Sequence, residues 1–259
     1  MLPSLQKHQQ MTDEQRYIFD LQGYIVLKNV VPLEVIQEVN TVLDWLEKLS
    51  PEELPYGVSH GKPRTEDELY LANMVEAHPI FHQFIDHPAV IPIIREITLG
   101  LFRLNHAYSI YRWGGGYTYM HMQNTPMHPK ATYHCQNGEI FSLTSKAVFP
   151  ISEQRAEDGC FAAIPGSHKA NFVNPFGVHP DENPNLVPVL ADPGDCIIFT
   201  EAMTHGSYVN TSGRPRRTLY YCYSVGYMPD WSKYGLQFSD RFMDSLTANQ
   251  REIVRRKDN

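Results

Sequence analysis

The chain has 259 residues, of which 42% are apolar and 20% are charged, a composition typical of a soluble globular protein. Its formal net charge of −7, without basic runs or a basic helix face, argues against a nucleic-acid or anionic-membrane partner. No apolar run approaches the ~18 residues of a membrane span, and the N-terminus lacks the apolar core of a signal peptide. The four cysteines show no CxxC spacing. We therefore expect a cytoplasmic protein with reduced thiols.

The first 100 residues are predicted to be mainly helical. Thr12 and Gln15 are spaced for a capping box at the start of a short helix, which Gly23 ends. A β-branched segment follows, and apolar residues then recur every three or four positions from Leu33 to Leu49, as in an amphipathic helix. Residues 51–68 read as a loop, and two further helical stretches are expected at 81–85 and 89–99.

Beyond Gly100 the pattern changes to short apolar segments that Gly, Pro and Asn separate at fairly even intervals. This pattern predicts a β-sandwich or barrel over residues 101–227, and residues 228–259 are predicted to form a helical extension. We therefore expect one domain over residues 1–259, mainly β with flanking helices.

Two histidines, an amide and an arginine stand out within the predicted barrel. His121 and Gln123 are two residues apart and would share one face of a strand, while His205 and Arg216 lie far downstream. Mononuclear iron(II) oxygenases hold their metal with two histidines and one carboxylate and leave other positions open. A guanidinium such as that of Arg216 can grip a carboxylate in a bidentate fork, as a keto-acid co-substrate requires.

The chain resembles the phytanoyl-CoA dioxygenase family of iron(II)- and 2-oxoglutarate-dependent enzymes over nearly its whole length. Three segments carry the resemblance: "LQGYIVLKNVVPLEVI", "EDGCFAAIPGSHKANF", and "PGDCIIFTEAMTHGS" together with Arg216. It implies a double-stranded β-helix (jelly-roll, cupin-like) core with iron on His121 and His205. It also implies that Arg216 and Ser207 hold the distal carboxylate of 2-oxoglutarate.

Gln123 departs from the family, whose usual members have a carboxylate at this position. A neutral amide is a weaker ligand for a divalent ion. Gln123 can bind the metal through its side-chain oxygen, or it can leave this ligand position to water. The open position can instead admit a halide ion, or the site can lack a metal. Glu201 or Glu139 can also supply the third ligand. Glu201 lies four residues before His205, which would separate them by ~13 Å on a straight strand, so this option needs a bend.

The pocket residues are less clearly marked by the sequence. Five residues are candidates to line a substrate pocket: Tyr119, Asn124, His128, His134 and His106. His134 is also a candidate third nitrogen ligand of the metal. For a single histidine the simplest interpretation is a satisfied core residue, and only the combination of His121, His205 and Arg216 with "PGSHK" outweighs it.

The expected function is oxidation of an unactivated C–H bond of a small-molecule metabolite with O₂, most often by hydroxylation. Halogenation, desaturation or cyclisation would use the same chemistry. The alternatives are a family member that binds a ligand without redox activity and a metal-dependent cupin-type barrel that needs no keto-acid.

Overall fold

The computed structural model describes residues 10–123, 130–228 and 238–254. The helices in these ranges, including four 3₁₀ turns labelled η, are α1 (Asp13–Gln22), α2 (Leu33–Lys48), η1 (Met74–Glu76), η2 (Pro79–Phe84), α3 (Ile91–Ile97), η3 (Ser167–Lys169), η4 (Pro180–Glu182), α4 (Asp240–Ser245) and α5 (Ala248–Val254). The strands are β1 (Tyr24–Leu27), β2 (Ser59–His60), β3 (Glu68–Ala72), β4 (Phe102–Arg112), β5 (Tyr133–Gln136), β6 (Glu139–Ser142), β7 (Thr144–Pro150), β8 (Phe161–Ala163), β9 (Val187–Val189), β10 (Cys196–Thr200), β11 (His205–Ser207) and β12 (Arg216–Val225). No helix in the described ranges is long and apolar enough to cross a membrane.

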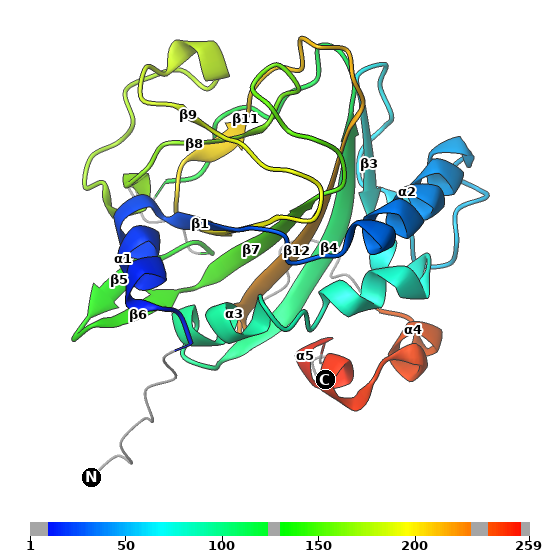
Figure 1. Ribbon diagram of the computed structural model, residues 1–259, viewed down its shortest axis with the longest axis horizontal. Helices are drawn as coiled ribbons and strands as arrows, with labels where there is room; N and C mark the ends of the chain where they lie inside the picture. The colour runs from blue at the N-terminus through cyan, green and yellow to red at the C-terminus, as the bar shows by residue number, and fades with distance from the viewer. Residues whose placement is uncertain (1–9, 124–129, 229–237, 255–259) are drawn as a thin grey trace.

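The described strands form two main antiparallel sheets. The large sheet has the order β1-β10-β7-β12-β4-β3-β2 and the small sheet the order β11-β8-β9, while β5 and β6 pair as a separate hairpin. The small sheet lies across the upper part of the large one (Figure 1). This arrangement is a jelly-roll core with few helices, which confirms the expected fold class.

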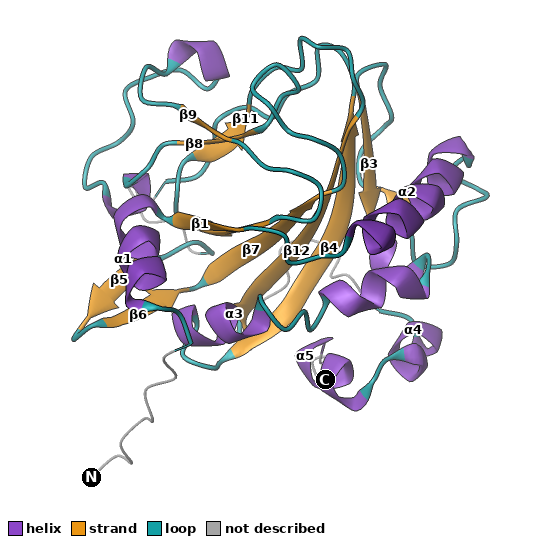
Figure 2. Ribbon diagram, in the orientation of Figure 1, coloured by secondary structure: helices purple, strands orange, loops and turns teal. Residues whose placement is uncertain are grey.

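The alternation of side chains along β12 divides the protein into two apolar layers. Leu219, Tyr221 and Tyr223 face outward and pack in the larger core against the helices, whereas Tyr220 faces inward, into a smaller core between the sheets. The hydroxyls of the outward-facing tyrosines donate hydrogen bonds to helical segments. The Tyr221 hydroxyl, for example, donates to the carbonyl oxygen of Phe81 at 2.6 Å. Helices α2, α3, α4 and α5 therefore lie on the outer side of the large sheet, and the inner side is left for the site (Figure 2).

The N-terminal part contributes strands as well as helices. The predicted capping box of Thr12 and Gln15 is present at the start of α1, and the left-handed Gly23 ends that helix. The chain then enters β1, which pairs with β10 at one edge of the large sheet, while β3 pairs with β4 near the other edge. The start of the chain thus completes both edges of the sheet that carries the site.

The segment 117–123, expected as a strand, is not a regular strand. Only His121 pairs, in an isolated antiparallel bridge with His205. The positive φ of 63° at Met122 turns the backbone immediately afterwards and ends the pairing. Gly206 permits this bridge, since an added Cβ would lie 2.6 Å from the carbonyl oxygen of Thr118.

Candidate active site

His121 and His205 lie side by side between the two sheets. Their backbones exchange two hydrogen bonds of 3.0 Å, and their ring centroids are 4.3 Å apart. His205 is the first residue of β11 and is buried. His121 is half-buried and lies in the segment 117–123. The structure therefore brings together the two histidines that the sequence predicts as ligands.

Both imidazoles are fixed in the tautomer that suits a metal. The Nδ1 atom of His121 lies 2.9 Å from the carbonyl oxygen of Tyr119, and that of His205 lies 2.7 Å from the carbonyl oxygen of Met203. A carbonyl only accepts, so each Nδ1 carries the proton and each Nε2 keeps a lone pair. Burial lowers the pKa of both rings, most strongly for His205, which keeps them neutral.

Glu201 supplies a carboxylate beside this pair. Strand β10 ends at Thr200 and β11 begins at His205, so a turn provides the bend that a straight strand would lack. Glu201 Oε1 lies 3.8 Å from His205 Nε2, and one ligand atom from each of His121, Glu201 and His205 lies within 4.8 Å of the others. Glu201 is 1% exposed, and its Oε2 has no hydrogen-bond partner among the described residues. Two neutral imidazoles and a carboxylate form a donor set that fits a divalent metal ion.

Lys146, on β7, is the buried counter-charge of Glu201. Its Nζ lies 3.0 Å from Glu201 Oε1 and also lies over the rings of Tyr108 and Phe199. Burial alone would lower the pKa of Lys146, but the Glu201 carboxylate outweighs it and holds that pKa well above its ordinary value. Lys146 is thus a cation that fixes one oxygen of Glu201. The sequence interpretation missed it, although a lone lysine within the apolar segment "TSKAVFP" was a signal.

Gln123 is engaged elsewhere. Its Oε1 accepts a hydrogen bond of 3.0 Å from the backbone N–H of Asn174, in the connection between β8 and β9. The other candidate carboxylate, Glu139, begins β6 in the separate hairpin, outside the His121–Glu201–His205 group. Of the oxygen ligands considered from the sequence, Glu201 is therefore the one that lies with the two histidines.

Arg216 is the first residue of β12, and only some of the N–H groups of its buried guanidinium have hydrogen-bond partners. It is 2% exposed, and its Nη2 donates to the Tyr220 hydroxyl at 3.2 Å. Its Nε and Nη1 have no hydrogen-bond partner among the described residues. A buried cation with two unused donors is costly unless an anion completes it, so Arg216 fits a carboxylate ligand.

Arg112 lies opposite Arg216 across β4 and β12, but the donors of its guanidinium are already used. Its Nε donates to Glu68 at 2.8 Å and its Nη1 donates to the Ser207 hydroxyl at 2.8 Å. Burial and the nearby charge of Arg216 together lower the pKa of Arg112. Ser207 also accepts from the backbone N–H of Thr118 at 2.8 Å, so its own O–H stays available for an acceptor. Arg112 was not predicted from the sequence.

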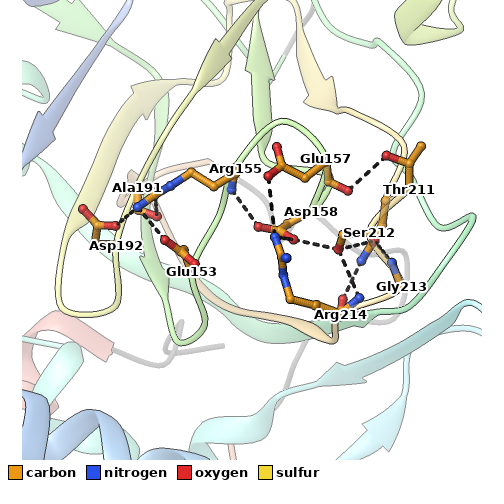
Figure 3. A network of polar contacts seen from close by, with 11 residues as sticks. Glu153, Arg155, Glu157, Asp158, Ala191, Asp192, Thr211, Ser212, Gly213 and Arg214 are labelled. Carbon is orange, nitrogen blue, oxygen red and sulfur yellow. Dashed lines mark hydrogen bonds and ion pairs between the residues drawn. The ribbon is translucent and has the colours of Figure 1, made fainter.

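A polar network holds the loop that leads to Arg216 (Figure 3). Arg214 Nη2 lies 2.6 Å from Asp158 Oδ1, and Ser212 donates to the same carboxylate at 2.7 Å. Asp158 belongs to the "EDGC" part of the family-like motif, and the next residue, Gly159, has a φ of +73°. A Cβ at Gly159 would lie 2.8 Å from the carbonyl oxygen of Tyr208. This part of the motif therefore holds the approach to Arg216. Further along the same motif, Ala163 pairs with His205 between β8 and β11, and the Phe161 ring stacks on the His205 ring with centroids 5.8 Å apart.

The histidines open into a cavity of about 250 Å³ between the sheets. Three of its aromatic walls are stacked: the Tyr70 and Tyr108 centroids are 4.8 Å apart and those of Tyr108 and Tyr220 are 4.6 Å apart. The lining residues include His121, His205, Lys146, Arg112 and Tyr119, together with Lys62, Phe161 and Phe199.

The other predicted pocket residues are scattered. Tyr119 lines the cavity. His106 is buried on β4, where its ring stacks on Tyr108 and burial lowers its pKa to about 3, and it is not among the lining residues. His134 is exposed on β5 against Phe141. Asn124 and His128 lie outside the described residues.

Comparisons with known proteins identify the family of this chain. The family model of phytanoyl-CoA dioxygenase matches residues 19–218. The dioxygenase olcK of Penicillium canescens is 22% identical over 222 residues, which cover 80% of this chain and 68% of olcK.

Two solved structures share the fold. The crystal structure of HygX from Streptomyces hygroscopicus, with nickel and 2-oxoglutarate bound, has a TM-score of 0.73 at 22% identity and covers 86% of this chain and 90% of HygX. SnoK, a non-haem alpha-ketoglutarate-dependent carbocyclase from nogalamycin biosynthesis, has a TM-score of 0.62 at 17% identity, over 85% and 86% of the two chains. The family match spans most of the chain, so the protein belongs to the phytanoyl-CoA dioxygenase family.

Proposed function

We propose that this oxidoreductase is an iron(II)- and 2-oxoglutarate-dependent dioxygenase that hydroxylates an unactivated C–H bond of a small-molecule metabolite. One observation carries the proposal: His121, His205 and Glu201 gather their ligand atoms within 4.8 Å, in the same barrel as a buried arginine that lacks an anion.

His121 and His205 would hold iron through their Nε2 atoms, and Glu201 would hold it through its carboxylate. Lys146 keeps Glu201 in place by its 3.0 Å contact, and the backbone carbonyls behind each histidine fix the ring orientation. When bound, iron(II) would activate O₂, the oxidant, and 2-oxoglutarate would supply two of the electrons that reduce O₂ as it is converted to succinate and CO₂.

Arg216 would bind the distal carboxylate of 2-oxoglutarate through its two unused N–H groups. Ser207 would donate its remaining O–H, while Arg112 and Thr118 hold its oxygen. Since Arg216 is buried, the carboxylate would be held in a low-dielectric environment where charge-assisted hydrogen bonds are strong. Glu68, Ser207 and Thr118 accept the hydrogen bonds of Arg112, so Arg216 is the one of these two guanidinium groups that has unused donors.

The same arrangement bears on the reaction outcome. Halogenation requires a vacated carboxylate position for halide, and Glu201 in the ligand set would fill that position. Hydroxylation, desaturation and cyclisation keep the full ligand set, and the carbocyclase SnoK shows that this fold also serves ring formation. The stacked aromatic walls of the cavity would exclude water from the reacting carbon.

The test is succinate formation from 2-oxoglutarate with Fe(II), ascorbate and O₂. We expect the wild-type chain to form succinate slowly without substrate, and His205→Ala to abolish it. His134→Ala, which removes an exposed histidine of the hairpin, is the matched control and should match the wild type. A wild-type chain that neither binds iron nor forms succinate would overturn the proposal in favour of a family member that binds a ligand without redox activity.

A further inference from the structure

The connection between β8 and β9 displays large apolar side chains to solvent. Phe172 is 86% exposed, Val173 59%, Phe176 41% and Val178 60%. This connection reaches outward at the upper left of Figure 1. Residues 170–178 contain no charged side chain. Four exposed apolar side chains within one short uncharged segment make it a candidate binding surface.

This connection is tied to the segment that carries His121. The Asn174 N–H donates to Gln123 Oε1 at 3.0 Å, and the Met120 N–H donates to the Val178 carbonyl at 2.6 Å. The His179 ring packs edge-on against Tyr117 at 4.9 Å. Gln123, at the family's carboxylate position, thus holds this connection beside the site.

The exposed residues continue into the cavity. Tyr117 and Tyr119 are 40% and 59% exposed, and both line the cavity that contains His121. The Tyr119 ring lies 5.3 Å from the His121 ring. We call these two tyrosines together with Phe172, Val173, Phe176 and Val178 the apolar rim.

The cavity is small for what it must hold. Pockets that enclose a drug-sized ligand usually measure roughly 300–1,000 Å³, whereas this one measures about 250 Å³ and would also contain 2-oxoglutarate. Only the reacting part of a larger substrate can therefore enter, and the rest must lie at the mouth.

We propose that the apolar rim binds the uncharged hydrophobic body of the substrate, and that Gln123 serves as the anchor of the rim and not as a metal ligand. The inference rests on the proposed function, which it deepens by naming the substrate class: a molecule with a bulky hydrocarbon or aromatic body. Charges or hydroxyls on the part of the substrate that lies along the rim would face apolar side chains. The carbon to be oxidised enters past Tyr119 toward His121.

The test uses Nile red, an uncharged apolar dye, with the full chain in the presence of Ni(II) and 2-oxoglutarate. We expect the dye to bind the wild type and Phe172→Ser/Phe176→Ser to weaken that binding by about tenfold or more, because two phenylalanine contacts are removed. Leu33→Ser removes an exposed apolar residue at the start of α2 and should bind the dye as the wild type does. Equal binding by the double variant and the wild type would overturn the proposal.

Gln123 is tested by two substitutions. Gln123→Ala removes the acceptor for Asn174 and should weaken dye binding several-fold while Ni(II) affinity is kept, and Gln123→Glu, which keeps an acceptor, should restore dye binding. Loss of Ni(II) binding in Gln123→Ala would instead place Gln123 on the metal and overturn its role as an anchor. Succinate formation by the wild type, measured separately, reports on the proposed function alone, so the two failures can be told apart.

Discussion

Glu201→Gln is the substitution that separates the two candidates for the third ligand. Glu201 is 1% exposed, and the side chain of its partner Lys146 is 9% exposed, with 3.0 Å between them. Breaking a buried ion pair by removing one partner costs about 3–5 kcal/mol, because the remaining charge stays buried. Total stabilities are about 5–15 kcal/mol, so the variant should fold but unfold at clearly lower denaturant concentration.

The same substitution should remove the charged metal ligand. Mutation of a residue that only hydrogen-bonds to a metal ligand already weakens metal binding about 10–100-fold. Loss of the ligating carboxylate itself should therefore weaken metal binding by about 100-fold or more. Calorimetric titration with Co(II) measures this affinity, and urea unfolding measures stability.

A double variant distinguishes the metal effect from the stability effect. Glu201→Gln/Lys146→Met removes both charges, so it should regain most of the lost stability while metal affinity stays low. Gln123→Ala is the comparison and should bind Co(II) as the wild type does. If the stable double variant bound Co(II) with wild-type affinity while Gln123→Ala did not, the assignment of Glu201 would be wrong.

Three further outcomes are expected. Arg216→Ala should keep Co(II) affinity but weaken 2-oxoglutarate binding about 10–100-fold by calorimetry, since charge-assisted hydrogen bonds are lost; equal loss of both ligands would contradict its role. The buried His168 ring contacts the carbonyl of Asp20, and burial lowers its pKa from 6.5 to about 4, so the unfolded chain binds the proton more tightly. The contribution of His168 to stability should therefore be full above pH 6.5 and fall by about 2 kcal/mol toward pH 5 in urea unfolding. His168→Asn should reduce the slope by this share and leave the part that other buried histidines such as His106 and His205 contribute. Gly159→Ala should lower the unfolding free energy by about 2 kcal/mol or more, because of its positive φ and the nearby Tyr208 carbonyl, and a wild-type midpoint would refute this reading.

Local patterns predicted much of the fold. The capping box at Thr12 and the three-and-four spacing of α2 depend on neighbours in sequence, so they could be read directly. The segment 117–123 could not, because its alternating residues resemble a strand, whereas His121 forms an isolated bridge and the backbone turns at Met122.

The site was predictable where a residue type alone carries the chemistry. His121, His205 and Arg216 stood out by type and spacing. The positions of Glu201 and Lys146 could not be predicted in this way. A turn between strands and the register of β10 against β7 bring these two residues together, and sequence spacing shows neither. Gln123 shows the opposite case, since its sequence position suggests a ligand while its hydrogen bond joins it to Asn174.

The central claim is that the barrel holds iron(II) and 2-oxoglutarate together. Anaerobic titration of the wild-type chain with Fe(II) and 2-oxoglutarate tests it most directly, because their chelate gives a weak visible charge-transfer band. We predict that the band appears and saturates at one iron per chain. No band, with no iron bound at stoichiometric levels, would contradict the account.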